Sequence, residues 1–237
     1  MRRRTLILGC ILAVIFPYTI GNGNTITNEN SIGRNSLGSG NSIAGTDRTS
    51  KPISPFLFDD FNYSNSDQMA AHGWTIRTTA GWPGLEGAVW RKEGISFQDD
   101  PALPGNRIVR MTSYTNGEGR GTQQSQICHE RKYREGTYAA RVRFSDMPVS
   151  GPDGDQIVES FYTICPLKAP MDPDYSELDF EYLPHGGWGK TGATLFVTSW
   201  FTFSPEPHWK QVNTSNSIAG SQSGWHTLVT QVAAGKV

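Results

Sequence analysis

Three acidic residues alternate with apolar or aromatic residues in the segment 175–182. The acids are Glu177, Asp179 and Glu181. Because successive side chains of an extended strand point to opposite faces, these three carboxyl groups would share one face. Closely spaced carboxyl groups repel one another when ionised, so their titrations are coupled and one is driven toward its protonated form. A protonated carboxyl group beside an ionised one is what general acid catalysis requires.

The reaction that such a pair suits is hydrolysis of a glycosidic bond with retention of configuration. It needs two carboxyl groups roughly 5–5.5 Å apart, one as nucleophile and the other as general acid and then base. The Cα atoms of Glu177 and Glu181 would lie about 13 Å apart in a strand, and two glutamate side chains leaning together close most of that distance. Asp179, between them, is too short to reach the sugar but can hydrogen-bond a neighbour. The alternative is a surface strand with its polar face in water, for which such alternation is ordinary.

The segments that would position these acids are short runs of β-branched and aromatic residues, broken by Gly, Pro, Asn or Asp. The predicted strands are 107–112, 138–144, 158–164, 177–182, 193–203 and 227–232. No long helical periodicity appears. The predicted fold class is therefore all-β, an antiparallel two-sheet sandwich of jelly-roll type, with the acids and a line of aromatic residues on a concave face.

Four aromatic residues and one histidine are candidate sugar contacts on that face. Tyr175 lies two residues before the first acid and would point to the same side. Trp188 follows in a Gly-rich loop, Trp200 falls on the next predicted strand, and His208 and Trp209 lie in a Pro-containing loop. Each aromatic residue could equally pack in the interior, as Trp and Tyr do in β-sandwiches.

The segment 177–181, Glu-Leu-Asp-Phe-Glu, resembles the catalytic signature of family 16 glycoside hydrolases, in the regular-strand form of the lichenase and xyloglucan-transferase branches. Four other segments resemble strands of that family in the same order: 58–62, 136–144, 160–164 and 224–228. The resemblance covers about residues 56–237. It implies Glu177 as the nucleophile, Glu181 as the acid/base, and Asp179 as a helper that holds Glu177 and tunes its proton affinity. Spacing alone does not assign these roles.

Composition excludes some classes of partner. With a net charge of −1 and 18% charged residues, the chain offers no electrostatic case for binding nucleic acid or an anionic membrane. Seven Trp and eight Tyr suit a surface that binds sugar rings, and 26 Gly with 14 Pro suit an all-β domain with many turns. Since no pair of Cys or His has the usual zinc-ligand spacing, we expect no zinc site. No metal site and no cofactor are predicted, and the sequence leaves a structural calcium ion open.

The N-terminal residues predict export. Three arginines followed by the apolar residues 6–15 indicate a secretory signal peptide, which we place at 1–21. Cys10 lies in the middle of this apolar run rather than at its end, which argues against lipid attachment. Residues 22–55, rich in Asn, Ser and Gly, predict a flexible linker before the folded domain at 56–237. After export Cys128 and Cys165 could form a disulfide or remain two separate thiols.

The C-terminal residues predict an incomplete sandwich. Residues 229–232 are typical of a strand and 233–236 of a hairpin turn, after which only Val237 follows. The family resemblance implies several further strands beyond this point, so we expect the C-terminal strands of the sandwich to be missing from this sequence.

The leading interpretation is a secreted, monomeric retaining endo-glycosidase that hydrolyses a β-linked polysaccharide, with β-glucan as the first candidate. Neither nucleic acid nor, after signal removal, a membrane is expected as a partner. One alternative is a non-catalytic carbohydrate-binding β-sandwich, although a lectin has no need of three spaced carboxyl groups. Another is a transglycosylase, which sequence does not separate from a hydrolase because both use the same nucleophile.

Overall fold

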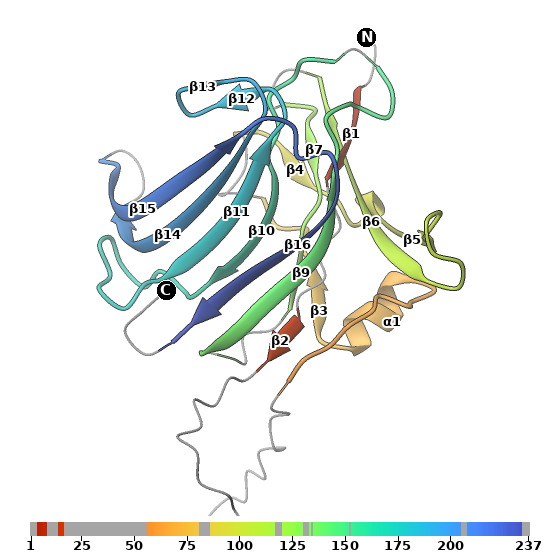
Figure 1. Cartoon of the computed structure of the whole chain (residues 1–237), viewed down its shortest axis with the longest axis horizontal. Coiled ribbons are helices and arrows are strands. Elements are labelled where there is room, and N and C mark those ends of the chain that lie inside the picture. The colour runs from red at the N-terminus through yellow and green to blue at the C-terminus, as the bar shows by residue number, and fades with distance from the viewer. Residues whose placement is uncertain are drawn as a thin grey trace, which may run out of the picture.

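The computed structural model describes residues 56–80, 86–116, 120–129, 133, 135–151, 153–204 and 208–233, together with the backbone of two short strands at 4–8 and 14–16. Nearly all of its regular structure is β-strand (Figure 1). The strands form several sheets whose pairs are antiparallel apart from one short parallel pair. The predicted all-β class is therefore confirmed.

The acidic strand lies inside a four-stranded antiparallel sheet with the order β10-β11-β14-β15, on the left in Figure 1. The strands are β10 (Glu159–Ile164), β11 (Glu177–Leu183), β14 (Thr194–Ser204) and β15 (Lys210–Ala219). Because β11 is hydrogen-bonded on both sides, its register fixes which side chains face each side of the sheet.

A second sheet, β16-β9-β2, packs against the face of this sheet opposite the acids. Its strands are β2 (Val14–Phe16), β9 (Gly136–Phe144) and β16 (Gly224–Val232). The buried core between the layers takes alternate residues from each strand: Tyr138, Ala140, Val142, Phe144, Phe161, Tyr182, Leu195 and Leu228. Alternation with period two thus builds a sandwich in which one face of β11 is core and the other is left for the acids.

A third group of elements contains a separate core, made of Phe61, Tyr63, Met69, Trp74, Ile95, Val109, Met111 and Ile127. Its strands and turn are β1 (Arg4–Leu8), β3 (Trp74–Ile76), β4 (Val89–Trp90), η1 (Lys92–Gly94), β5 (Ile95–Asp99), β6 (Arg107–Thr115), β7 (Gln123–Gln124) and β8 (Ile127–His129). The helix α1 (Ser66–Ala71) begins at Asn65, whose side chain accepts the backbone N–H groups of Asp67 and Gln68. It places Met69, fully buried, against Trp74, Val109 and neighbouring apolar side chains. A short hairpin, β12 (Gly186–Gly187) with β13 (Lys190–Thr191), follows the acidic strand.

The six strands predicted from sequence are all present, with ends that differ by a few residues. The strand β15 was missed because its sequence is rich in Asn, Ser and Thr, which favour turns. It forms because β14 supplies a complete hydrogen-bonding partner along ten residues. Pairing with a neighbouring strand here overrides local propensity.

The predicted opening strand at 58–62 is wrong. The segment is irregular, because Asp59 Oδ1 accepts the N–H of Phe61 at 2.7 Å and Asp60 Oδ1 accepts that of Asn62 at 3.1 Å. Such bonds to a residue two positions ahead turn the chain. Phe61 also has a φ of 55°, in the left-handed region that is rare for a bulky residue.

Two strands fall within the segment predicted as a signal peptide. The backbone of β1 pairs with β6, and that of β2 pairs with β9. Export of the chain stays a prediction. The predicted linker at 22–55 and all but the first residue of the turn at 233–236 lie outside the described residues.

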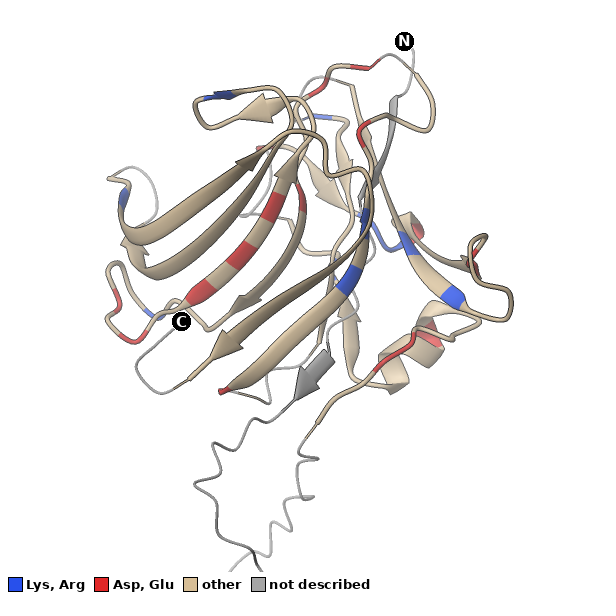
Figure 2. Ribbon diagram, viewed as in Figure 1, with Lys and Arg blue, Asp and Glu red and all other residues tan. Residues whose placement is uncertain are grey.

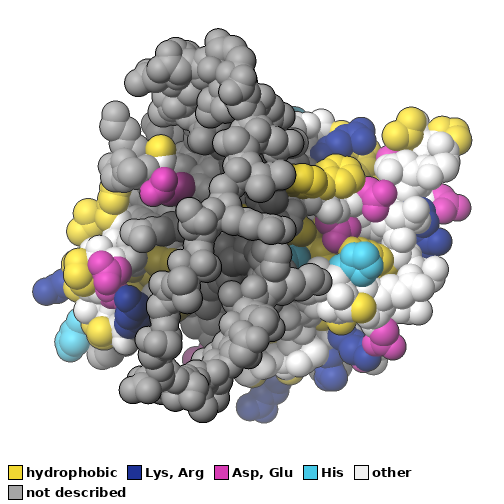
Figure 3. All heavy atoms as spheres, turned by 90° about the horizontal axis from the view of Figure 1, so that it is seen from below, with side chains coloured by type: hydrophobic (Ala, Val, Ile, Leu, Met, Phe, Trp, Pro, Cys, Tyr) yellow, Lys and Arg dark blue, Asp and Glu magenta, His cyan; other side chains and the backbone are white. Residues whose placement is uncertain are grey.

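The surface carries both signs of charge. Figure 3 shows one face, on which acidic, basic and hydrophobic side chains are interspersed over the described residues. No single-sign patch dominates that view, in keeping with the net charge of −1. Within the part of the chain that the structure describes, no helix is long and apolar enough to cross a bilayer.

Candidate active site

The three acids follow one another along β11 (Figure 2). Leu178, Phe180 and Tyr182, at the alternating positions, belong to the opposite face, where Phe180 and Tyr182 join the core between the layers. Strand pairing directly opposes Tyr162 of β10 and Thr198 of β14 to Asp179. Asp179 is 5% exposed. The acids therefore lie among other side chains on a partly buried sheet face, with Asp179 buried and the two glutamates half-buried, not on an open surface strand.

The register gives each glutamate its own cross-strand neighbours. Glu177 is opposite Trp200 of β14, and Glu181 is opposite Phe196 of the same strand. Side chains directly opposite on antiparallel strands lie about 4.5–5.5 Å apart at Cβ, so they contact one another. Each glutamate is therefore flanked by an aromatic ring.

Asp179 lies at the centre of the hydrogen bonds. Its Oδ2 accepts the indole N–H of Trp200 at 2.6 Å, and its carboxyl group shares a hydrogen bond with Glu177. Burial raises the pKa of Asp179 far above its ordinary value, and the charges of Glu177 and Glu181 raise it further. The Trp200 N–H lowers that pKa by a smaller amount. Asp179 therefore keeps its proton at neutral pH and donates it toward Glu177.

Glu177 receives two hydrogen bonds. The hydroxyl of Tyr175 donates to its Oε2, and Asp179 donates to the same carboxylate. Burial raises the pKa of Glu177 above its ordinary value, and the two hydrogen bonds offset only part of that rise. Because both donors favour the charged form, Glu177 is the member of the triad best able to be ionised.

Glu181 is the least supported of the three acids. Among the described residues, its carboxyl group has no hydrogen-bond partner. Burial raises the pKa of Glu181 to about 7, with a further contribution from the charge of Glu177. A glutamate that holds its proton up to neutral pH beside an ionised one is suited to donate a proton to a leaving group.

The aromatic residues predicted as sugar contacts occupy different surroundings. The Trp200 ring lies 6.1 Å from that of Trp209 and is close to Phe203, forming a cluster on the Glu177 side. Trp188, 58% exposed, packs edge-on against Phe196 at 5.1 Å on the Glu181 side. His208 is exposed ahead of β15. Sugar contact by these residues stays a prediction.

Tyr175 lies on the side of the acids, as the sequence predicted, but it is buried. Its exposed fraction is 2%, so its ring has no open face for a sugar. The ring instead packs edge-on against Phe203 at 5.0 Å, and its hydroxyl reaches Glu177. The prediction that Tyr175 points to the side of the acids is correct, whereas its assignment as a sugar contact is not supported.

Sequence reasoning missed Tyr162, which lies beside Asp179. Burial raises the pKa of Tyr162, with added effects from Cys128 and from the charge of Glu177, whereas Arg77 lowers it. The feature of the sequence that could have pointed to Tyr162 is the alternation of side chains in the predicted strand 158–164. That alternation divides its residues between two faces but does not say which face meets the acids.

Cys128 and Cys165 are both free thiols. Cys128 is exposed on β8, and the sulfur of Cys165 accepts the backbone N–H of Ser176 at 2.9 Å. Of the two outcomes left open by the sequence, the structure has the separate thiols. In the described part of the chain no three His, Cys, Asp or Glu residues gather in a way that could hold a metal ion.

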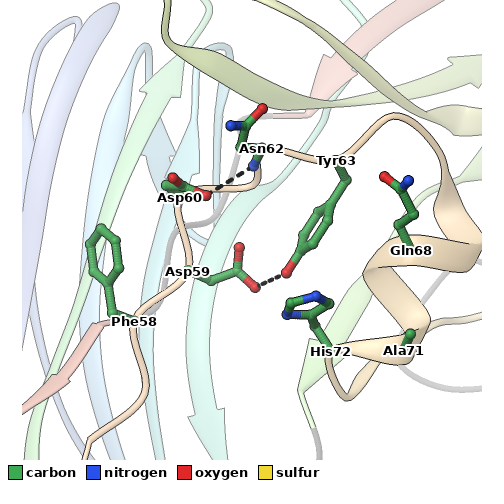
Figure 4. Close-up of a pocket in the computed structure, with 8 residues that line it drawn as sticks. All are labelled: Phe58, Asp59, Asp60, Asn62, Tyr63, Gln68, Ala71 and His72. Carbon is green, nitrogen blue, oxygen red and sulfur yellow. Dashed lines mark hydrogen bonds between the residues drawn. The ribbon is translucent and has the colours of Figure 1, made fainter.

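A pocket of about 570 Å³ lies beside α1 (Figure 4). It is lined by Phe58, Asp59, Asp60, Asn62, Tyr63, Gln68, Ala71 and His72. Its two acids both accept hydrogen bonds from their own loop: Asp59 from the Tyr63 hydroxyl and Asp60 from the Asn62 N–H. These acids hold the loop in shape, so the pocket is a weaker candidate than the acidic face of β11.

Comparisons with known proteins add no further constraint. No family model, curated protein or solved structure matches this chain. A functional assignment therefore depends on the geometry and chemistry of the site.

Proposed function

We propose that the protein is a retaining endo-glycosidase that hydrolyses a β-linked polysaccharide, with β-glucan as the first candidate substrate. The observation that carries the proposal is a set of three carboxyl groups on one partly buried sheet face, whose charged forms are stabilised to different degrees. Two donors hold Glu177, whereas Glu181 has a pKa of about 7 and Asp179 retains a proton between them.

In the first step Glu181 is the general acid. It protonates the glycosidic oxygen as Glu177 attacks the anomeric carbon, which breaks the bond to the leaving group and forms a glycosyl ester. That ester removes the negative charge of Glu177, which is one of the causes that raise the pKa of Glu181. The pKa of Glu181 then falls, so the same group can accept a proton from the attacking water.

Of the three acids, Glu177 is best suited to act as the nucleophile. An ionised carboxylate is required for attack, and the Tyr175 hydroxyl and Asp179 both favour that form. When the ester forms, Asp179 can withdraw its hydrogen bond and keep its proton, because burial holds its pKa high. Asp179 thus supports Glu177 without bonding to the sugar.

The residues around the acids support cleavage within a long polysaccharide chain rather than at its end. The sheet face continues past β14 onto β15, where Ser215 hydrogen-bonds Thr198 at 2.9 Å. Aromatic rings lie on both sides of the acids, Trp200 beside Glu177 and Phe196 beside Glu181. A long chain crossing this face would find polar and aromatic contacts on either side of the bond to be cleaved.

The test is release of reducing ends from a panel of 1,3- and 1,4-linked glucans and galactans. We expect turnover by the wild-type protein and its loss in Glu177→Ala and Glu181→Ala. Binding of a polysaccharide without any turnover would instead support the carbohydrate-binding alternative. Transfer products formed with an added oligosaccharide acceptor, in place of hydrolysis, would support the transglycosylase.

Azide separates the two roles. With an aryl β-glycoside, Glu177→Ala in azide should yield a glycosyl azide of inverted configuration, because azide replaces the missing nucleophile. Glu181→Ala should yield one of retained configuration, because azide then attacks the covalent intermediate. An inverted product from Glu181→Ala would reverse the assignment.

A further inference from the structure

A buried tyrosine acts directly on the proposed nucleophile. The hydroxyl of Tyr175 donates a hydrogen bond to Oε2 of Glu177. At 2% exposure, Tyr175 is shielded from water. A hydrogen bond to an ionised group is stronger than one between neutral groups, and exclusion of water strengthens it further.

The tyrosine is anchored on more than one side. Its ring packs edge-on against Phe203 at 5.0 Å, and its backbone N–H donates to the carbonyl of Asp172 at 3.1 Å. The same loop is tied to β14 through the Met171 N–H, which donates to the Phe203 carbonyl at 2.9 Å. Tyr175 is therefore held by the sheet on which the acids lie, and its hydroxyl has a fixed position.

We propose that Tyr175 is a positioning residue that holds Oε2 of Glu177 and thereby orients the carboxylate for attack on the anomeric carbon. This inference rests on the proposed function, since it concerns the same nucleophile. The terminal torsion of a glutamate is broad, so an unheld carboxylate samples many orientations. Fixing one orientation lowers the barrier because the reacting atoms are already aligned. Tyr175 acts through Glu177 and does not touch the substrate.

The titratable groups around this pair come from three parts of the chain. They are Asp179 and Glu181 on β11, Tyr162 on β10, and Cys165 at the end of that strand. Burial raises the pKa of Tyr175, and the bond to Glu177 raises it further, so the hydroxyl remains a donor over the working pH range. Removing that hydroxyl should raise the pKa of Glu177, because one of its two supporting hydrogen bonds is lost.

The experiment compares Tyr175→Phe with Tyr182→Phe in the full chain. Tyr182 is a matched control, since it is also buried and its hydroxyl also donates to a carboxylate, that of Asp146. We expect Tyr175→Phe to lower kcat by about ten- to a hundredfold with little change in KM. Its acid limb in the pH–rate profile should move to higher pH, whereas that of Tyr182→Phe should coincide with wild type.

A second pair of measurements does not depend on turnover. The carboxyl carbon of Glu177, labelled with ¹³C, should titrate at higher pH in Tyr175→Phe. Replacing Tyr175 by 3-fluorotyrosine keeps the ring and makes the hydroxyl a stronger donor, so Glu177 should titrate at lower pH. If the wild-type protein cleaves no polysaccharide, the proposed function fails while these titrations still decide whether Tyr175 holds Glu177. An unchanged pH–rate profile and unchanged Glu177 titrations in an active enzyme would overturn the inference alone.

Discussion

Two buried aspartates in this protein each accept a tryptophan N–H, but they differ in how many other groups donate hydrogen bonds nearby. Asp59, beside α1, accepts the indole N–H of Trp74 at 2.6 Å, and Asp179, on β11, accepts that of Trp200 at the same distance. Asp59 is 6% exposed and Asp179 is 5% exposed. Burial and a tryptophan donor therefore do not distinguish them.

The difference lies in the number of donors for each carboxyl group. Asp59 alone receives three, from Trp74, the Tyr63 hydroxyl and the Phe61 N–H. On β11, the donors from other described residues are one tryptophan N–H and one tyrosine hydroxyl for three acids. A single carboxyl group with several donors holds a loop together. Three carboxyl groups with few donors must share protons, and shared protons are what acid–base catalysis uses.

The largest expected effect is a loss of activity without loss of stability when a glutamate of the acidic strand is replaced. Glu181→Gln should lower kcat by about a hundredfold to ten-thousandfold, because the proton donor is lost. Glu177→Gln should lower it further, because no covalent intermediate forms. Both variants should remain folded, since the two glutamines are neutral and nearly isosteric. Initial rates and circular dichroism on the same samples test this, and near-normal rates would remove the acids from the mechanism.

Asp59→Ala should lower the stability of the protein more than its activity. It leaves the donors of Trp74, Tyr63 and Phe61 without their acceptor, at a cost of about 1–3 kcal/mol for each buried donor that finds no other partner. We expect the free energy of unfolding to fall by about 3 kcal/mol or more, measured by urea denaturation. Asp60→Ala is the control, because Asp60 is exposed and, within the described part of the chain, accepts one hydrogen bond, from the Asn62 N–H. Equal stability of the two variants would end the structural role of Asp59.

Asp179→Asn should cost less activity than the loss of either glutamate. The amide can still donate to Glu177 and accept from Trp200, but it has no proton to share. We therefore expect a shifted pH–rate profile with substantial residual turnover. If Asp179→Asn were as inactive as Glu177→Gln, Asp179 would itself take part in bond cleavage.

The smallest expected effect concerns stability against pH. The pKa of Glu181 is raised in the folded protein to about 7 from an ordinary 4.5. The folded state therefore binds this proton more tightly than the unfolded state does. The resulting contribution to folding stability is fully present below pH 4.5 and is lost as pH rises through about 7. Relative to Glu181→Gln, the wild-type protein should lose thermal stability over this interval. If the melting temperatures of the wild-type protein and Glu181→Gln changed in parallel from pH 4.5 to 8, the raised pKa of Glu181 would be contradicted.

Much of the framework could be predicted from the chain. The runs at 138–144 and 177–182 carry clear period-two alternation and became β9 and β11. The run at 210–219 has no such apolar alternation, and only its pairing with β14 makes it a strand. The segment 58–62 was misread because two aspartates accept N–H groups two residues ahead and turn the chain.

For the site, the sequence by itself determined that Glu177, Asp179 and Glu181 share one face, because alternation in a strand is a local property of the backbone. The tertiary structure decided which side chains meet them. Tyr162 and Trp200 come from other strands, and their positions depend on register between segments distant in sequence. Burial by those neighbours sets the unequal proton affinities of the three acids. Burial arises only when the sheets pack, so the face could be read from the sequence and its chemistry could not.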